Sequence, residues 1–203
     1  MDEQMYENNG EKTETTGERP SFVKELISWT IIFAIALTLS LFLHRCVIIN
    51  AKIPSGSMET TIMTGDRMIG NRLAYINSEP KRGDVIIFKY PDDESQNFIK
   101  RVIGLPGEKV TITDSHIYID EKEIPLEESY LPEEWINGND GLEYIVPEDS
   151  YFVLGDNRNI SKDARFWENT YVKRDKIIAK AGLVYWPLSD VGFVDSAEYS
   201  IDK

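Results

Sequence analysis

Two serines separated by one glycine stand in the segment IPSGSM at residues 53–58, and a serine hydroxyl can attack a carbonyl carbon. A serine beside Gly and Pro is most often part of a turn, so a catalytic role requires a base that takes its proton. The chain has two histidines. His44 adjoins a long apolar segment and His116 lies in an ordinary hairpin sequence. A histidine-based triad therefore stays open but has no local signature.

Lysine is the second residue type that could act as the base. In FIKRVI at residues 98–103, strand alternation puts Lys100 on the face that Phe98 and Val102 share, and Arg101 on the opposite face. One of these cations could therefore point into an apolar core, where burial lowers a lysine pKa by up to ~3–5 units from about 10.4. Such a lysine is a general base near neutral pH. Alternation fits equally well a solvated edge strand whose lysine points outward.

A third polar segment, GDNRNISKDAR at residues 155–165, follows a strand-like run and is a turn by default. Asp163 and Arg165 are close enough in an extended loop to pair and fix its shape, and Ser161 could hydrogen-bond to a base. The triplet at residues 159–161 also matches the N-glycosylation pattern, which often occurs by chance.

The elements that must position these residues are mostly strands. Alternating or β-branched runs between turn residues predict six of them: Val85–Phe88, Phe98–Ile103, Val110–Thr113, His116–Ile119, Tyr151–Leu154 and Ala181–Trp186. Asp114-Ser115 indicates a hairpin turn. The polar, acidic span of about residues 121–150 is interpreted as an inserted excursion. We therefore predict a mainly β fold, a partly closed antiparallel β-sheet, behind a single N-terminal helix.

That helix is a predicted membrane anchor. From Leu26 to Leu43 the chain carries no charge and no proline, and it would span roughly 27 Å of a ~30 Å hydrocarbon core. No small-x-small cleavage site follows it, and a buried core helix would usually carry a polar stripe. The flanking basic residues favour an inside N-terminus only slightly: Lys12, Arg19 and Lys24 precede the segment, whereas Arg45 and Lys52 follow it. We expect a disordered tail at residues 1–23, the anchor at 24–46 and the folded domain at 47–203.

Composition excludes several function classes. A formal net charge of −13 argues against nucleic-acid partners and against electrostatic docking on anionic lipid. The single cysteine, Cys46, cannot form an internal disulfide, and together with two histidines it argues against a zinc site. We expect no metal and no cofactor.

The three segments occur in one order behind the anchor, as PSGSM at 54–58, FIKRVIGLPGE at 98–108 and GDNRNISKDAR at 155–165. In this arrangement the chain resembles bacterial type I signal peptidases from the anchor to about Pro187, and the single anchor is closer to the Gram-positive form. The resemblance implies a membrane-anchored serine endopeptidase that removes signal peptides from exported preproteins. It also implies an N-terminus in the cytoplasm, a catalytic domain on the extracytoplasmic side of the cell membrane, and the lipid bilayer as a partner.

The resemblance assigns a role to each site residue. Ser57 corresponds to the nucleophile, Lys100 to the general base and Ser161 to the group that orients its amine. Ser55 corresponds to the side chain that joins the Ser57 N–H in the oxyanion hole, and Asp163 with Arg165 to a structural ion pair. Shallow apolar pockets that accept small substrate residues at positions −1 and −3 are implied for Ile53, Pro54, Met58, Ile62, Phe98 and Ile99.

The sequence also departs from the family pattern. Thr60 stands where proline is usual, Asn159-Ile160 where Asp-Asn is usual, and Ala164 replaces a frequent serine. Three other protein classes are weaker matches. A non-catalytic anchored β module would lack the nucleophile or the base, a self-cleaving Ser/Lys repressor would carry a DNA-binding domain instead of an anchor, and a sortase would need a cysteine within the β domain.

Overall fold

The computed structural model describes residues 22–136 and 141–202, so the expected tail at residues 1–23 lies almost entirely outside the described residues. Helix α1 spans Phe22–Phe42 and passes into a π-helical turn, Leu43–Val47. Every side chain of α1 is exposed to its surroundings, and within the described part of the chain it is the one helix long and apolar enough to cross a membrane. Its Thr30 and Thr38 hydroxyls donate to Leu26 O and Ala34 O, both at 2.8 Å, which satisfies these polar groups inside the helix, as an apolar surrounding requires.

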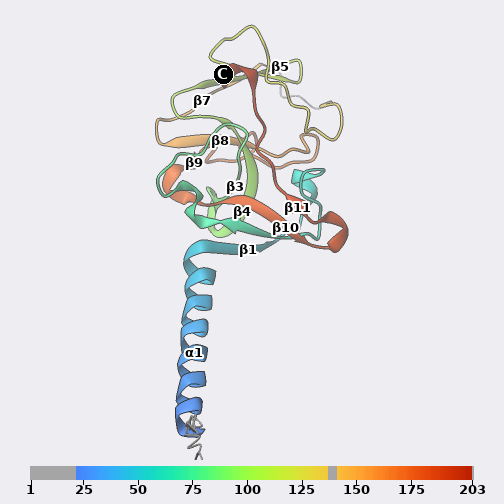
Figure 1. Ribbon diagram of the computed structural model, residues 1–203. Coiled ribbons are helices and arrows are strands. Elements are labelled where there is room, and N and C mark those ends of the chain that lie inside the picture. Colours follow the sequence, from blue (N-terminus) through green and yellow to red (C-terminus); the bar gives the residue numbers. More distant parts are fainter. Residues whose placement is uncertain (1–21, 137–140, 203) are drawn as a thin grey trace, which may run out of the picture. The chain divides into compact units, whose positions relative to one another are not determined.

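A second unit, from Phe42 onward, contains all the strands. Its larger sheet has eight antiparallel strands in the order β1-β2-β10-β3-β4-β8-β9, with β11 paired to β10 (Figure 1). The strands are β1 Ile48–Lys52, β2 Arg67–Asn71, β3 Val85–Tyr90, β4 Asp93–Gly104, β8 Ser150–Leu154, β9 Val172–Lys173, β10 Ile177–Trp186 and β11 Gly192–Phe193. Within the described residues, five 3₁₀ turns connect or end them: Gly56–Met58, Arg72–Tyr75, Arg174–Lys176, Leu188–Asp190 and Ser200–Asp202.

A smaller three-stranded sheet has the order β6-β5-β7, with β5 Lys109–Thr113, β6 His116–Ile119 and β7 Leu142–Ile145. The predicted hairpin joins β5 to β6. Asp114 and Ser115 both have positive φ, 49° and 59°, which matches the backbone twist of a two-residue hairpin turn.

Two apolar clusters stabilise this unit. The larger packs β3, β4 and β8 against the small sheet and includes Phe88, Phe152 and Trp167. The smaller consists of Ile53, Met58, Ile62, Met68, Val85, Ala181, Val184 and Val194. It lies directly beneath the segment that carries the two serines and therefore fixes that segment against β2 and β10.

The prediction of a mainly β, antiparallel fold preceded by an apolar helix is confirmed. The sheet itself does not close, since β1 and β9 form its two edges. All six predicted strands are present, and β4 and β10 extend further toward the N-terminus than their apolar runs. Strand β7 lies inside the predicted excursion at residues 121–150.

Candidate active site

The serine-bearing segment forms a single 3₁₀ turn, Gly56–Met58, which follows Ser55 in extended conformation. Ile53 precedes the turn and Met58 is its last residue, and both are buried in the smaller cluster. The backbone closes around them, because Ile53 N donates to Asp66 O at 2.9 Å and Ile62 N donates to Met58 O at 2.9 Å. With both neighbours anchored, Ser57 is held half-buried at the surface of the sheet.

Lys100 lies on β4, paired with Ile86 of β3, and only 4 % of its surface is exposed. Its Nζ is 2.6 Å from Ser57 Oγ and 3.0 Å from Ile99 O. Burial lowers the pKa of Lys100 to about 8, although the negative charges of Asp163 and Asp156 act in the opposite direction. In its neutral form, an amine in contact with a hydroxyl can remove the hydroxyl proton.

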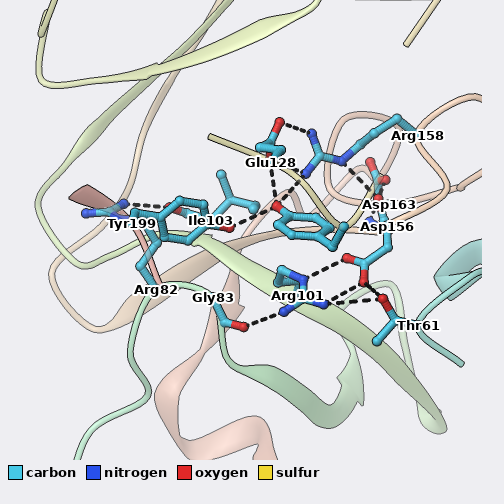
Figure 2. Close-up of polar contacts among 12 residues, drawn as sticks. Thr61, Arg82, Gly83, Arg101, Ile103, Glu128, Asp156, Arg158, Asp163 and Tyr199 are labelled. Carbon is cyan, nitrogen blue, oxygen red and sulfur yellow. Dashed lines mark hydrogen bonds and ion pairs between the residues drawn. The ribbon is translucent and has the colours of Figure 1, made fainter. Parts of the chain in front are cut away.

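Arg101, the next residue of β4, is also buried, and Figure 2 shows it among its polar partners Asp156, Thr61 and Gly83. Its Nε and Nη2 donate to the two oxygens of Asp156 at 2.8 and 2.7 Å, and Asp156 accepts a 2.5 Å hydrogen bond from Thr61 Oγ1. Burial opposes the charge of Arg101, but Asp156 outweighs it and raises the pKa of the guanidinium. Both cations of the Lys-Arg pair therefore point inward, and the edge-strand alternative is excluded for this chain.

The third segment packs directly on the serine turn. Asn157 N donates to Ser57 O at 3.1 Å. A Cβ at Gly155 would lie 2.2 Å from Ser161 Oγ and 2.4 Å from Ser57 O, so only glycine fits between them. Asp163 fixes the loop, since its Oδ2 accepts from Gly155 N at 3.0 Å and its carboxylate binds Arg165 Nε and Nη2 at 2.7 and 2.9 Å.

The remaining two serines differ in environment. Ser161 is buried beside Gly155, and among the described residues its Oγ has no hydrogen-bond partner. The two hydrogen bonds of the Lys100 amine go to Ser57 and Ile99, so the expected contact between Ser161 and Lys100 is not made in this structure. Ser55 is exposed, makes no capping bond and lines the cavity beside Ser57.

A cavity of about 600 Å³ opens beside the Ser57–Lys100 pair, between β1 and residues 96–100 of β4. Five of the six predicted pocket residues line it: Ile53, Pro54, Met58, Phe98 and Ile99. The sixth, Ile62, is fully buried beneath the turn and is not among the lining residues. The third segment contributes Ile160 and Lys162, which the sequence did not suggest as lining residues.

Sequence reasoning also missed the ion pairs that hold the third segment in place. Arg101 pairs with Asp156, and Arg158 pairs with Glu128 from the excursion. The available signal was the density of charged residues in GDNRNISKDAR, which is unusual for a loop that follows a fully buried strand. Within residues 22–136 and 141–202, no group of three or more His, Cys, Asp or Glu side chains is arranged to hold a metal ion.

The family model and the similar proteins agree on one family. The family described as "Signal peptidase, peptidase S26" matches residues 26–186. A probable signal peptidase I-2 from Synechocystis is 36% identical over 179 residues, covering 83% of this chain and 77% of that protein. Signal peptidase I from Leptolyngbya laminosa is 40% identical over 168 residues, 78% of each chain. A crystal structure of a signal peptidase I from Enterococcus faecalis has 33% identity and a TM-score of 0.43, covering 51% of this chain and 97% of that one.

Proposed function

Since this chain belongs to the signal peptidase family, peptidase S26, we propose that it removes signal peptides by a Ser57–Lys100 acyl-enzyme mechanism while anchored in a membrane. The family makes it a serine endopeptidase with preproteins as substrates. The observation that carries the proposed mechanism is the 2.6 Å contact between Lys100 Nζ and Ser57 Oγ, with the amine buried and its pKa lowered to about 8.

In the acylation step, neutral Lys100 takes the Ser57 proton while Oγ attacks the scissile carbonyl carbon. The resulting ammonium then gives that proton to the leaving amine, and the peptide C–N bond breaks. In deacylation a water molecule takes the place of Ser57 as proton donor to Lys100 and attacks the acyl ester, which frees the carboxylate of the signal peptide and restores the hydroxyl.

The negative charge of the tetrahedral intermediate needs donors at the serine turn. We propose that the Ser57 backbone N–H and the Ser55 hydroxyl supply them, because Ser55 is exposed beside Ser57 and makes no capping bond that would hold its hydroxyl elsewhere. Losing one such donor typically costs about 10²–10³ in rate. Ser161 has a buried hydroxyl without a partner among the described residues, and this makes it available to orient the Lys100 amine during the reaction.

The shape of the cavity supports an extended substrate. β1 is an edge strand, and the cavity lies between it and β4, so a substrate segment can add backbone hydrogen bonds to a strand edge. Alternate side chains of such a segment point to the same face. Positions −1 and −3 would then face the apolar lining of Ile53, Met58 and Ile99, whereas position −2 would face away. Small pockets there would exclude large side chains.

We propose the anchor at residues 24–46 and the catalytic domain at 47–203. The apolar helix α1 and the charge-free run from Leu26 to Leu43 support a single span of the cell membrane. The N-terminus would lie in the cytoplasm and the catalytic domain outside, where signal peptides emerge. Confining enzyme and substrate to one surface raises their effective concentration.

Cleavage of a model preprotein by the full chain in lipid vesicles tests the mechanism. Ser57→Ala and Lys100→Met should each abolish processing, whereas Lys173→Met, which removes an exposed lysine of β9, should process at the wild-type rate. Processing by Ser57→Ala or Lys100→Met at the wild-type rate would refute the assignment. A preprotein with Phe at −1 should resist cleavage, and one with Phe at −2 should not.

A further inference from the structure

Residues 126–136 of the excursion, which lie between β6 and β7 in the chain, pack on the third segment rather than extending into solvent. Leu126 and Trp135 of residues 126–136 are buried. Leu126 N donates to Ile117 O at 2.8 Å, which fixes the start of this stretch on β6. At its end, Asn159 uses both halves of its amide: Nδ2 donates to Glu134 O at 3.0 Å and Oδ1 accepts from Ile136 N at 3.0 Å. Because a carboxylate at position 159 could not donate, this departure from the usual Asp has a physical reason.

Glu128 connects this stretch to the loop that packs on Ser57 (Figure 2). Its carboxylate binds Arg158 in a fork, with Nη1–Oε2 at 2.9 Å and Nη2–Oε1 at 2.5 Å, and the two side chains are 7 % and 1 % exposed. Arg158 Nε donates to Gly155 O at 2.9 Å. Gly155 is the residue that fits between Ser57 O and Ser161 Oγ, so one guanidinium joins Glu128 to the backbone beside the nucleophile.

Tyr130 connects the same stretch to the other side of β4. Its hydroxyl donates to Glu128 Oε1 at 2.6 Å and lies 2.8 Å from the Tyr199 hydroxyl. Burial, followed by the charge of Glu128, raises the pKa of Tyr130 well above its usual value, so the hydroxyl stays protonated and can donate. The guanidinium carbon of Arg101 lies 4.1 Å from the centre of the Tyr130 ring, a cation–π contact.

We propose that Glu128 and Tyr130 are positioning residues, which hold residues 155–165 against Ser57 and Lys100 through Arg158 and Arg101. Neither touches the reacting atoms, and the inference rests on the Ser57–Lys100 mechanism proposed above. If Glu128 loses its charge, Arg158 becomes a buried cation without a carboxylate partner and its hold on Gly155 weakens. The loop then retreats from the serine turn and water reaches Lys100.

This mechanism predicts a direction for the pH profile. Burial is the largest influence on Lys100, ahead of the opposing charges of Asp163 and Asp156. Two further cations lie nearby, Arg101 next along β4 and Lys162 on the cavity wall. When the loop retreats, the Lys100 amine becomes exposed to water, and the largest influence on its pKa, burial, is removed. The pKa of Lys100 then rises, and the pH midpoint of activity moves to higher pH.

The test measures kcat, KM and the pH midpoint of cleavage for the full chain in vesicles, alongside the thermal unfolding temperature. Glu128→Gln should lower kcat about tenfold, change KM less than twofold and move the midpoint upward by about half a pH unit. Glu128→Asp, which keeps the charge, should recover part of kcat. Tyr130→Phe keeps the ring over Arg101 and should lower kcat about threefold, which provides a folded variant if Glu128→Gln fails to fold. Glu127→Gln changes the exposed neighbour and should behave as wild type.

Two results would overturn the inference. One is a folded Glu128→Gln or Tyr130→Phe with wild-type kcat and midpoint. The other is a loss of activity fully explained by the unfolded fraction, with an unchanged midpoint in the folded enzyme. Ser57→Ala is measured in parallel: if it still cleaves, the proposed mechanism fails, whereas an inactive Ser57→Ala beside an unaffected Glu128→Gln refutes the positioning role alone.

Discussion

The lowered pKa of Lys100 makes the pH dependence of cleavage a quantitative test of the mechanism. Only the neutral amine can take the Ser57 proton, so activity should rise with pH through the pKa of Lys100, about 8. The neutral fraction is then roughly one half at pH 8, about one tenth at pH 7 and about one hundredth at pH 6. A solvated lysine with a pKa near 10.4 would be neutral to only about 0.4% at pH 8. Burial therefore supplies a rate factor of roughly 100 at that pH.

The assay is kcat/KM for a preprotein or peptide substrate at about pH 6 to 10, which reports the pKa of the free enzyme. The substrate should carry no group that titrates in this range. Circular dichroism at each pH provides the control that the enzyme remains folded. We expect a slope near one on a logarithmic plot below pH 7 and a plateau above about pH 9. A flat profile between pH 6 and 9 with an intact fold would refute Lys100 as the base, and a midpoint near that of a free lysine would refute the lowering of its pKa by burial.

Three further variants test the energetics of the site. Lys100→Met should lose cleavage yet raise the unfolding temperature at pH 7. The pKa of Lys100 is lower in the folded than in the unfolded protein, so the wild-type free energy of unfolding rises only between about pH 8 and 10.5. At neutral pH the buried charge therefore costs the wild type about 3 kcal/mol at most, a cost that methionine removes. An equal or lower unfolding temperature would count against burial as the cause. Asp156→Asn leaves a buried guanidinium without its carboxylate and should lower the free energy of unfolding by about 3–5 kcal/mol in a urea titration; a loss below about 1 kcal/mol would contradict this. Gly155→Ala forces a Cβ to 2.4 Å from Ser57 O and should lower kcat by about 100-fold, whereas Gly192→Ala, whose Cβ meets nothing nearer than 4.0 Å, should cleave normally. Equal activity of these two alanine variants would show that the serine turn tolerates the displacement.

The strands that local sequence patterns encode were predicted. The strands that depend on contacts with distant segments of the same chain were not. The runs at residues 85–88 and 151–154 alternate or are continuously apolar, and each became a buried strand. β9 and β11 have two residues each, and no periodicity can be recognised over that length. β2 reads RMIGN, where Gly70 argues against a strand. The structure explains why glycine stands in this strand, because a Cβ at Gly70 would lie 2.6 Å from the Ile87 side chain of β3.

In the candidate site, too, the local features were predicted from sequence patterns and the contacts between distant segments were not. Each of its three segments is short and recognisable, but strand alternation left open whether Lys100 or Arg101 faces inward, and the contact of Ser57 with Lys100 was predicted only through the resemblance to signal peptidases. The pairing of Glu128 with Arg158 could not be predicted. The two residues are 30 positions apart, and Glu128 lies among several acidic residues that look alike in sequence. Which one is buried depends on how the excursion packs against Arg101 of β4 and against the third segment, which no local pattern specifies.

The adjacent cations on β4 show how the fold shifts the pKa values of neighbouring residues in opposite directions. Lys100 is buried with a hydroxyl and a carbonyl as its hydrogen-bond partners, and the more distant charges of Asp163 and Asp156 offset only part of the burial effect, so its pKa is lowered. Arg101 is buried more deeply, but it meets the carboxylate of Asp156 in a fork and keeps its charge. A guanidinium cannot give up its proton near neutral pH, whereas an ammonium can. In the proposed mechanism the order Lys-Arg therefore has a chemical meaning: Lys100, which has to become neutral, faces the Ser57 hydroxyl, and Arg101, which stays charged, holds the loop that buries Lys100.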